Sequence, residues 1–293
     1  MTYRILGLVT LYIWGVGPLF SQIQDRDFKI YATSLEREIS LAELVEQVAD
    51  VDVLFFGEEH KDSLGHRLQD ALYGRLLAEY AEVTLSMEMF ETDCQLVVDE
   101  YLEGWITEEK LIREGRAWNN YRTAYRPMVE RAKANQQAVV AANAPRRYVN
   151  LVGRKGFDSL KGLSKTARRF LPKLPITRGD TTYERRFHDI MGASGHTLDD
   201  KFFQAQCTWD ATMSDRIYRH WRKQKPRLIY HLNGRFHTDY QLGTFAQLRL
   251  RNRRLRIQNI SCFSIPDLTQ PNWSEHAGIA DYIIVTRKLP AEK

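Results

Sequence analysis

Two short segments of the sequence share the pattern Gly-x-x-His, a glycine followed three residues later by a histidine. They are 57–60 and 234–237. A glycine directly after a strand permits a sharp turn and lets a ligand approach the backbone. An imidazole that titrates near neutral pH is suited to general acid–base chemistry or to metal binding. Because the turns match, we expect a functional role for His60 and His237 rather than the surface or core role of an isolated histidine.

The elements that must position these turns alternate along the chain. Short apolar runs typical of buried strands occur at 51–56, 83–90, 138–142, 227–232, 257–263 and 282–286. Stretches with helical spacing of apolar residues occur at 64–80, 93–102, 127–136, 198–223 and 240–251. This alternation predicts an α/β fold with a mainly parallel sheet flanked by helices. Two stretches without strand signals, about 101–126 and 146–195, predict helical insertions that form a smaller all-α subdomain.

Polar side chains follow four of the predicted strands. Glu58 and His60 follow the first, Glu88 lies within the second, Asn143 follows the third, and His237 follows the strand that ends near 232. Ligands bind at the carboxyl edge of an open parallel sheet, so these side chains predict one site there. An unpaired carboxylate is costly to bury, so Glu88 should pair with an arginine or bind a ligand.

Further residues near this edge could contact a ligand. Glu59 is an alternative to Glu58, for which the pattern gives only a weak preference. His66 follows the first turn on a helix whose amino end adds a positive field. Tyr121 and Tyr125 lie four residues apart in an aromatic segment. If this segment is helical, the two phenols share a face and either pack into the core or form an apolar wall with hydroxyl groups for a ligand.

The composition is that of an ordinary globular protein. The 293 residues are 43% hydrophobic and 27% charged, with a net charge of +5. The charge is uneven, since 146–186 holds twelve Lys or Arg and three acidic residues. Such a stretch is typical of a surface that meets a membrane, a nucleic acid or an anionic ligand, and equally of a solvated helix face. No nucleic-acid-binding module is recognisable, so nucleic acid is not an expected partner.

The amino-terminal segment has the layout of a secretory signal peptide. Arg4 precedes a mostly apolar stretch, 5–20, and Ser21 follows it. We therefore predict a signal peptide at 1–21 and one domain at 22–293, with a single membrane anchor as the alternative. The three cysteines, at 94, 207 and 262, are widely spaced and predict neither a disulfide framework nor a metal site.

Taken in order, these segments resemble the ChaN-like haem-binding uptake family, which belongs with the TIKI and erythromycin-esterase-like superfamily. The resemblance covers roughly 50–264. It is carried by Phe56-Gly57-Glu58-Glu59-His60, His66, Gln69, Met87-Glu88-Met89-Phe90, Trp118, Tyr121, Tyr125, Pro127, Ala142-Asn143-Ala144-Pro145-Arg146 and Gly234-Arg235-Phe236-His237. It implies an α/β sheet with a smaller helical part and a place in the bacterial cell envelope, in the periplasm. Family members are often lipoproteins, but this sequence has no cysteine after its apolar leader.

The first function implied by the resemblance is haem binding for haem or iron uptake. A tyrosine would ligate the iron, with Tyr121, Tyr125, Tyr148 and Tyr183 as candidates. Arginines such as Arg146, Arg147 or Arg122 would meet the haem propionates, because guanidinium matches carboxylate geometry. His66 and Asn143 would complete the cofactor site. The implied partners are haem, an outer-membrane haem or iron receptor, and a second copy of the chain.

The alternative function implied by the resemblance is a hydrolase of the peptidase or esterase type. Its catalytic residues would be Glu58, His60, Glu88 and His237. In the metal-dependent version, His60, Glu88 and His237 bind a divalent transition metal ion that keeps an open position for water. In the metal-free version, His60 is a general base that a glutamate orients.

Overall fold

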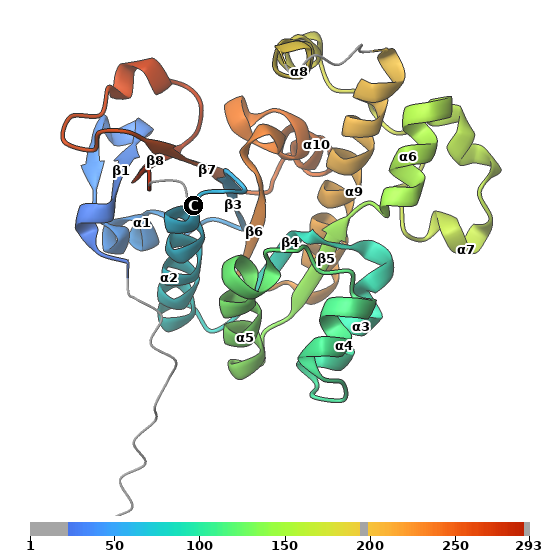
Figure 1. The fold of residues 1–293 in the computed structure, drawn as a ribbon, viewed down its shortest axis with the longest axis horizontal. Helices are drawn as coiled ribbons and strands as arrows, with labels where there is room; N and C mark the ends of the chain where they lie inside the picture. The colour runs from blue at the N-terminus through green and yellow to red at the C-terminus, as the bar shows by residue number, and fades with distance from the viewer. Residues whose placement is uncertain (1–22, 194–198, 290–293) are drawn as a thin grey trace, which may run out of the picture.

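A computed structural model describes residues 23–193 and 199–289, so the predicted signal peptide lies outside the described residues. One sheet of eight strands organises this part of the chain (Figure 1), in the order β2-β1-β8-β7-β3-β6-β4-β5. The strands are β1 (Phe28–Ala32), β2 (Arg37–Ile39), β3 (Val53–Glu58), β4 (Val83–Glu91), β5 (Val139–Asn143), β6 (Leu228–Gly234), β7 (Ile257–Ile265) and β8 (Tyr282–Arg287). The pairs from β8 to β5 are all parallel, which confirms the predicted α/β class.

The antiparallel edge of the sheet was not predicted. β1 pairs antiparallel with both β2 and β8. β1 alternates buried and half-buried residues, and β2 has only three residues, so neither produces the continuous apolar run of the central strands.

The helices agree with the predicted order but differ at several ends. They are α1 (Leu41–Gln47), α2 (Ser63–Glu79), α3 (Gln95–Leu102), α4 (Glu108–Glu114), α5 (Arg126–Ala134), α6 (Arg146–Lys155), α7 (Lys165–Arg168), α8 (Thr181–Ala193), α9 (Asp200–Gln224) and α10 (Gly243–Arg251). The last helix begins at Gly243 rather than at 240, because Tyr240 and Gln241 have positive φ angles of 59° and 57°. The described residues of the two predicted insertions contain helices and no strand.

The two faces of the sheet pack against different helices. Leu54 and Phe56 of β3 belong to the large core that also contains side chains of α1, α2 and α5. Val53 and Phe55 point to the opposite face and join a smaller core with residues of α9 and α10. This alternation along one strand follows from the two-residue period of β structure.

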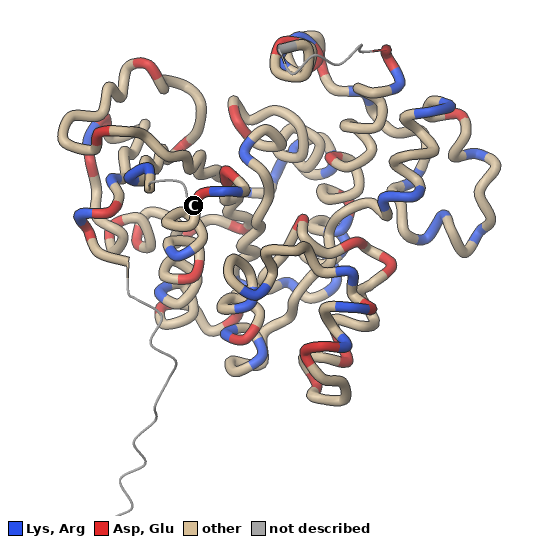
Figure 2. Tube along the Cα trace, in the orientation of Figure 1, with Lys and Arg blue, Asp and Glu red and all other residues tan. Residues whose placement is uncertain are grey.

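Helices α6 and α7 of the basic stretch 146–186 lie to one side of the sheet, with α6 next to α9 (Figure 1). Lysines and arginines recur along α6 and α7, on the right of the view (Figure 2). Among the described residues, no helix combines the length and the apolar character that a membrane crossing requires.

Candidate functional site

The two Gly-x-x-His turns leave neighbouring parallel strands at the same edge of the sheet. In the register of β3 and β6, Gly57 lies opposite Asn233 and Glu58 lies opposite Gly234. The turns touch: a Cβ atom on Gly57 would lie 2.8 Å from the Cα of Arg235, and one on Gly234 would lie 2.8 Å from Nε2 of His60. Side chains at these positions would push the turns apart, so glycine is required at both.

Glu58 forms the centre of the first half of the site. Its Oε1 accepts a 2.8 Å hydrogen bond from Nδ1 of His60 and a 2.6 Å hydrogen bond from the Tyr125 hydroxyl. The Gln69 amide donates to Oε2. Burial alone raises the pKa of Glu58, but hydrogen bonds from His60, His66 and Tyr125 outweigh burial and lower the pKa to about 2. Glu58 is therefore a buried, ionised group that orients the 45% exposed imidazole of His60.

His66 supports Glu58 from α2. Its Nδ1 lies 3.2 Å from Oε1 of Gln69 and 3.5 Å from Oε2 of Glu58, and its Nε2 lies 3.2 Å from the carbonyl oxygen of His60. All of these partners are acceptors, so both ring nitrogens carry a proton. Burial lowers the pKa of His66, but the contacts with Glu58 outweigh it and raise the pKa to about 9. His66 lies near this edge of the sheet, as expected from the sequence, but it is buried against Glu58 and is not exposed to a ligand.

His237 forms the second half of the site with a carboxylate that the sequence did not reveal. Its Nδ1 donates to Oδ1 of Asp210 over 2.7 Å. Asp210 lies on α9 and also accepts hydrogen bonds from Tyr183 (2.8 Å) and Thr244 (2.9 Å). Burial lowers the pKa of His237, but the charges of Glu88 and Asp210 outweigh it and raise the pKa to about 9. Nothing in the sequence distinguishes Asp210 from other acidic residues of α9, such as Asp215.

Glu88 lies between the two histidine–carboxylate pairs. Its Oε2 accepts a 2.7 Å hydrogen bond from the backbone N–H of Gly234, and its Oε1 lies 3.6 Å from Nε2 of His237. Burial lowers the pKa of His60, but the hydrogen bond with Glu58 and the charge of Glu88 outweigh burial, so the pKa is raised. The predicted residues Glu58, His60, Glu88 and His237 thus come together, and this set can accept and donate protons across a small space.

The same residues do not form a metal site in this conformation. Within residues 23–193 and 199–289, no group of three or more His, Cys, Asp or Glu side chains is arranged to hold a metal ion. Nδ1 of each histidine is engaged by its own carboxylate, so Nε2 is the ring nitrogen that each would offer to an ion, and Glu88 accepts from a backbone N–H. Glu59 turns away and accepts hydrogen bonds from Ser264.

The tyrosines predicted as ligands occupy three different environments. Tyr121 is 1% exposed, and its hydroxyl has no hydrogen-bond partner. Tyr125 and Tyr183 are equally buried and donate to Glu58 and Asp210. Burial raises the pKa of all three phenols. Tyr148 is half-buried, and the guanidinium of Arg147 lies over its ring at 4.4 Å, so it is the only one of the four candidates near the surface.

A cavity of about 430 Å³ opens beside the first pair. It is lined by Met89, Glu91, Arg116, Ala117, Trp118, Asn119 and Arg146. The ring of Trp118 lies edge to face with that of His60, with centroids 5.1 Å apart. Arg146 lines the cavity, whereas Arg147 is paired with Asp93, and the cavity residue Arg116 is paired with Glu91 and Asp93. Arg116 was not singled out from the sequence, where it is one exposed arginine among many.

Asn143 ends β5, where its side chain accepts a hydrogen bond from the N–H of Ala144 over 2.9 Å. It is 8% exposed, and in this position it shapes the turn into α6. Arg122, the third candidate for an anion-binding residue, forms ion pairs with Glu108 and Glu109.

Comparisons with known proteins place this architecture in a family. The family model described as "Haem-binding uptake, Tiki superfamily, ChaN" matches residues 44–248. The solved structure of ChaN of Campylobacter jejuni, described as a cofacial haem complex, matches with a TM-score of 0.67 and 16% identity, over 90% of this chain and 98% of that one. The erythromycin esterase EreC matches with a TM-score of 0.48 and 11% identity, over 91% and 84% of the two chains. No curated protein sequence matches the chain. The family match covers more than half of the sequence, so this protein belongs to the haem-binding uptake family of the Tiki superfamily, as the sequence motifs had indicated.

Proposed function

We propose that this protein binds haem in the bacterial cell envelope and takes part in haem or iron uptake. The observation that carries the proposal is the family match over residues 44–248. The envelope location rests on the signal peptide predicted from the sequence at 1–21. An outer-membrane haem or iron receptor and a second copy of the chain are the partners that this function calls for.

The cavity beside Trp118 has the chemistry that haem requires. Haem is a flat apolar ring with two propionate groups, and when bound it supplies an iron ion that accepts an axial ligand. Trp118 offers apolar surface, while Arg116 and Arg146 are exposed cations on the same cavity. Guanidinium groups pair well with carboxylates, so Arg146, which has no ion pair among the described residues, is the proposed partner of one propionate. Arg116 would meet the other propionate by exchanging its ion pairs with Glu91 and Asp93.

Tyr148 is the proposed axial ligand. It lies on α6, whose first residue Arg146 lines the cavity; Tyr148 is not in the lining itself but is half-buried, unlike Tyr121 and Tyr125. Nη2 of Arg147 lies 3.3 Å from its hydroxyl oxygen, and a tyrosine oxygen is a ligand that ferric iron accepts. A ligand near the surface also allows a second copy of the chain to cover the exposed face of the haem.

A haem titration tests this proposal. Ferric haem is added to the purified protein while the Soret and charge-transfer bands are recorded, and the wild-type protein should bind haem with the spectrum of a high-spin tyrosinate complex. Tyr148→Phe should lose that spectrum, whereas the matched variant Tyr121→Phe should keep it. Size-exclusion chromatography with and without haem measures whether two chains assemble.

Two outcomes would overturn the proposal. The absence of any Soret change at stoichiometric haem would exclude haem binding. A spectrum that survives Tyr148→Phe but disappears in Tyr125→Phe would move the axial ligand to the interior network. Arg116→Gln together with Arg146→Gln should weaken haem binding without changing the ligand spectrum, because these arginines are proposed to hold only the propionates.

The paired histidines favour a second candidate function, a hydrolase. The specific observation is that Glu58–His60 and Asp210–His237 face the common carboxylate Glu88. In such a reaction, neutral His60 would take a proton from water as the water oxygen attacks an ester or amide carbonyl. Protonated His237 would then give a proton to the leaving group, so that the charges balance.

Hydrolysis of a panel of aryl esters and short peptides tests the second function. His60→Gln and His237→Gln should each abolish any turnover, and His188→Gln, a change at a surface histidine away from the site, should not. Turnover that persists in both site variants would refute the assignment. Since the haem titration does not depend on turnover, the two proposals succeed or fail separately.

A further inference from the structure

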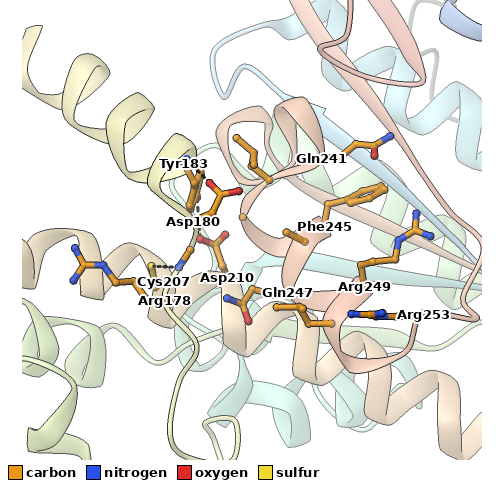
Figure 3. A pocket seen from close by; sticks show the side chains of 15 residues that line it. Arg178, Asp180, Tyr183, Cys207, Asp210, Gln241, Phe245, Gln247, Arg249 and Arg253 are labelled. Atoms are coloured by element: carbon orange, nitrogen blue, oxygen red, sulfur yellow. Dashed lines mark hydrogen bonds between the residues drawn. The ribbon is translucent and has the colours of Figure 1, made fainter.

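A second and larger cavity lies between the start of α8, helix α9 and helix α10 (Figure 3). Its volume is about 720 Å³, which is in the range of sites for drug-sized molecules. It shares no lining residue with the cavity beside Trp118. Asp210 of the second histidine pair lines it, but neither proposed function places a ligand in this space.

The body of this cavity is largely apolar. Leu242, Phe245, Ala246 and Leu250 line it from α10 and the residue that precedes this helix. Leu250 is 61% exposed. A ligand with an apolar body would remove this surface from water, which is favourable in proportion to the area covered.

The floor of the cavity is polar but already satisfied. Tyr183 and Asp210 point toward one another there (Figure 3), and their hydrogen bond is 2.8 Å long. The other oxygen of Asp210 accepts from His237 and Thr244. Gln247 donates to the carbonyl of Thr177. A ligand therefore finds a closed floor, and charge recognition must come from elsewhere in the cavity.

Two arginines of the cavity form no ion pair among the described residues. Arg249 lies over the ring of Phe245 at 5.5 Å, and Arg253 has no ion pair or hydrogen bond in the described part of the chain. Both are exposed and come from the same side of the cavity (Figure 3). Arg178 differs, because it points away and is paired with Glu184 and Asp200.

Among the described residues, two acids that form no ion pair lie near these cations: Asp180 lines the cavity, and the half-buried Asp281 is within electrostatic range of Arg249. Asp180 is exposed, and its Oδ1 accepts the backbone N–H of Tyr183 in the first turn of α8. Asp210 is compensated by His237, whose pKa is raised to about 9. On the open side, two lining arginines therefore face one lining carboxylate, which favours an anion over a cation.

We propose that this cavity binds a small, largely apolar molecule that carries a carboxylate or sulfonate, with Arg249 and Arg253 holding the anionic group. The site is separate from the proposed haem site and does not depend on it. It shares a wall with the second histidine pair: a Cβ on Gly243 would lie 2.6 Å from the carbonyl oxygen of His237 and 3.0 Å from Oδ1 of Asp210. A bound molecule would thus lie directly behind the His237–Asp210 pair.

Two dyes of nearly the same shape separate anion recognition from simple apolar binding. The first is 8-anilinonaphthalene-1-sulfonate, and the second is N-phenyl-1-naphthylamine, which has the same rings without the sulfonate. Fluorescence titration of the full chain should show tighter binding of the sulfonate. The double variant Arg249→Gln, Arg253→Gln should weaken binding of the sulfonate about three- to tenfold, as expected for two exposed charge contacts. It should leave binding of the neutral dye unchanged.

Arg254→Gln is the matched control, since Arg254 is exposed and adjacent but does not line the cavity. Leu250→Glu is a second test, because it removes apolar lining and adds a negative charge, and it should weaken binding of the sulfonate more than that of the neutral dye. The proposal is overturned if the double variant and Arg254→Gln bind the sulfonate equally. It is also overturned if one equivalent of haem displaces the dye, because the cavity would then be the haem site itself.

Discussion

The pair formed by His237 and Asp210 gives the sharpest prediction, which concerns Asp210→Asn. The pKa of His237 is raised from 6.5 to about 9: burial lowers it, and the charges of Glu88 and Asp210 together with the Asp210 hydrogen bond outweigh burial. At about 1.4 kcal/mol per pH unit, this rise corresponds to about 3 kcal/mol. Asparagine keeps the size of the side chain but removes its charge. We expect the variant to lose at least half of this stabilisation, about 2 kcal/mol, so that the pKa falls to about 7.5 or below.

NMR measures this pKa directly. The Cε1–H resonances of the histidines are followed from pH 5 to pH 10 in protein with ¹³C-labelled histidine, and His237→Gln assigns the signal. Asp180→Asn is the control, because Asp180 is exposed and forms no contact with His237. If the pKa of His237 stayed above 8.5 in Asp210→Asn, Glu88 alone would hold the proton and the assignment of Asp210 as its partner would be wrong.

The same substitution should change how stability depends on pH. A folded-state pKa raised above the unfolded value gives a stabilisation that is fully present below about pH 6.5 and is lost as the pH rises through about 9. Urea denaturation at pH 6 and pH 9.5 should therefore show a smaller difference in unfolding free energy for Asp210→Asn than for the wild type. His66 also has a raised pKa, so the comparison between the two proteins, rather than either curve alone, is informative.

Two further changes test the first half of the site. Gly234→Ala should displace the His60 ring, because the new Cβ would lie 2.8 Å from its Nε2. In an NMR titration, the pKa of His60 should then fall toward 6.5. Gly162→Ala is the control, because its Cβ meets open space and should leave the pKa of His60 unchanged. Glu58→Gln should lower the pKa of His66 from about 9 in the same experiment, and an unchanged value would exclude Glu58 as its partner. Because the pKa of Glu58 is lowered to about 2, its ionisation stabilises the fold above about pH 4.5, and this contribution is lost as the pH falls toward 2. The unfolding free energy of Glu58→Gln should therefore fall less steeply with pH in that range than that of the wild type.

Local patterns were sufficient to predict much of the fold and half of the site. Buried parallel strands are continuous apolar runs, so β3, β4, β6 and β7 were found within a few residues of their ends. The polar residues that follow those strands converge because all parallel strands end at one edge. The short antiparallel edge of β1 and β2 lacks such a run and was missed.

The sequence by itself determined the family, the α/β class and the convergence of His60, Glu88 and His237. Only the tertiary structure identified Asp210 as the partner of His237, because the packing of α9 brings together two residues that are distant in sequence and that no local pattern joins. It also separated surface tyrosines from buried ones, since helical spacing fixes which residues share a face but not what covers that face. Packing decides these points, and packing depends on residues that are distant in sequence.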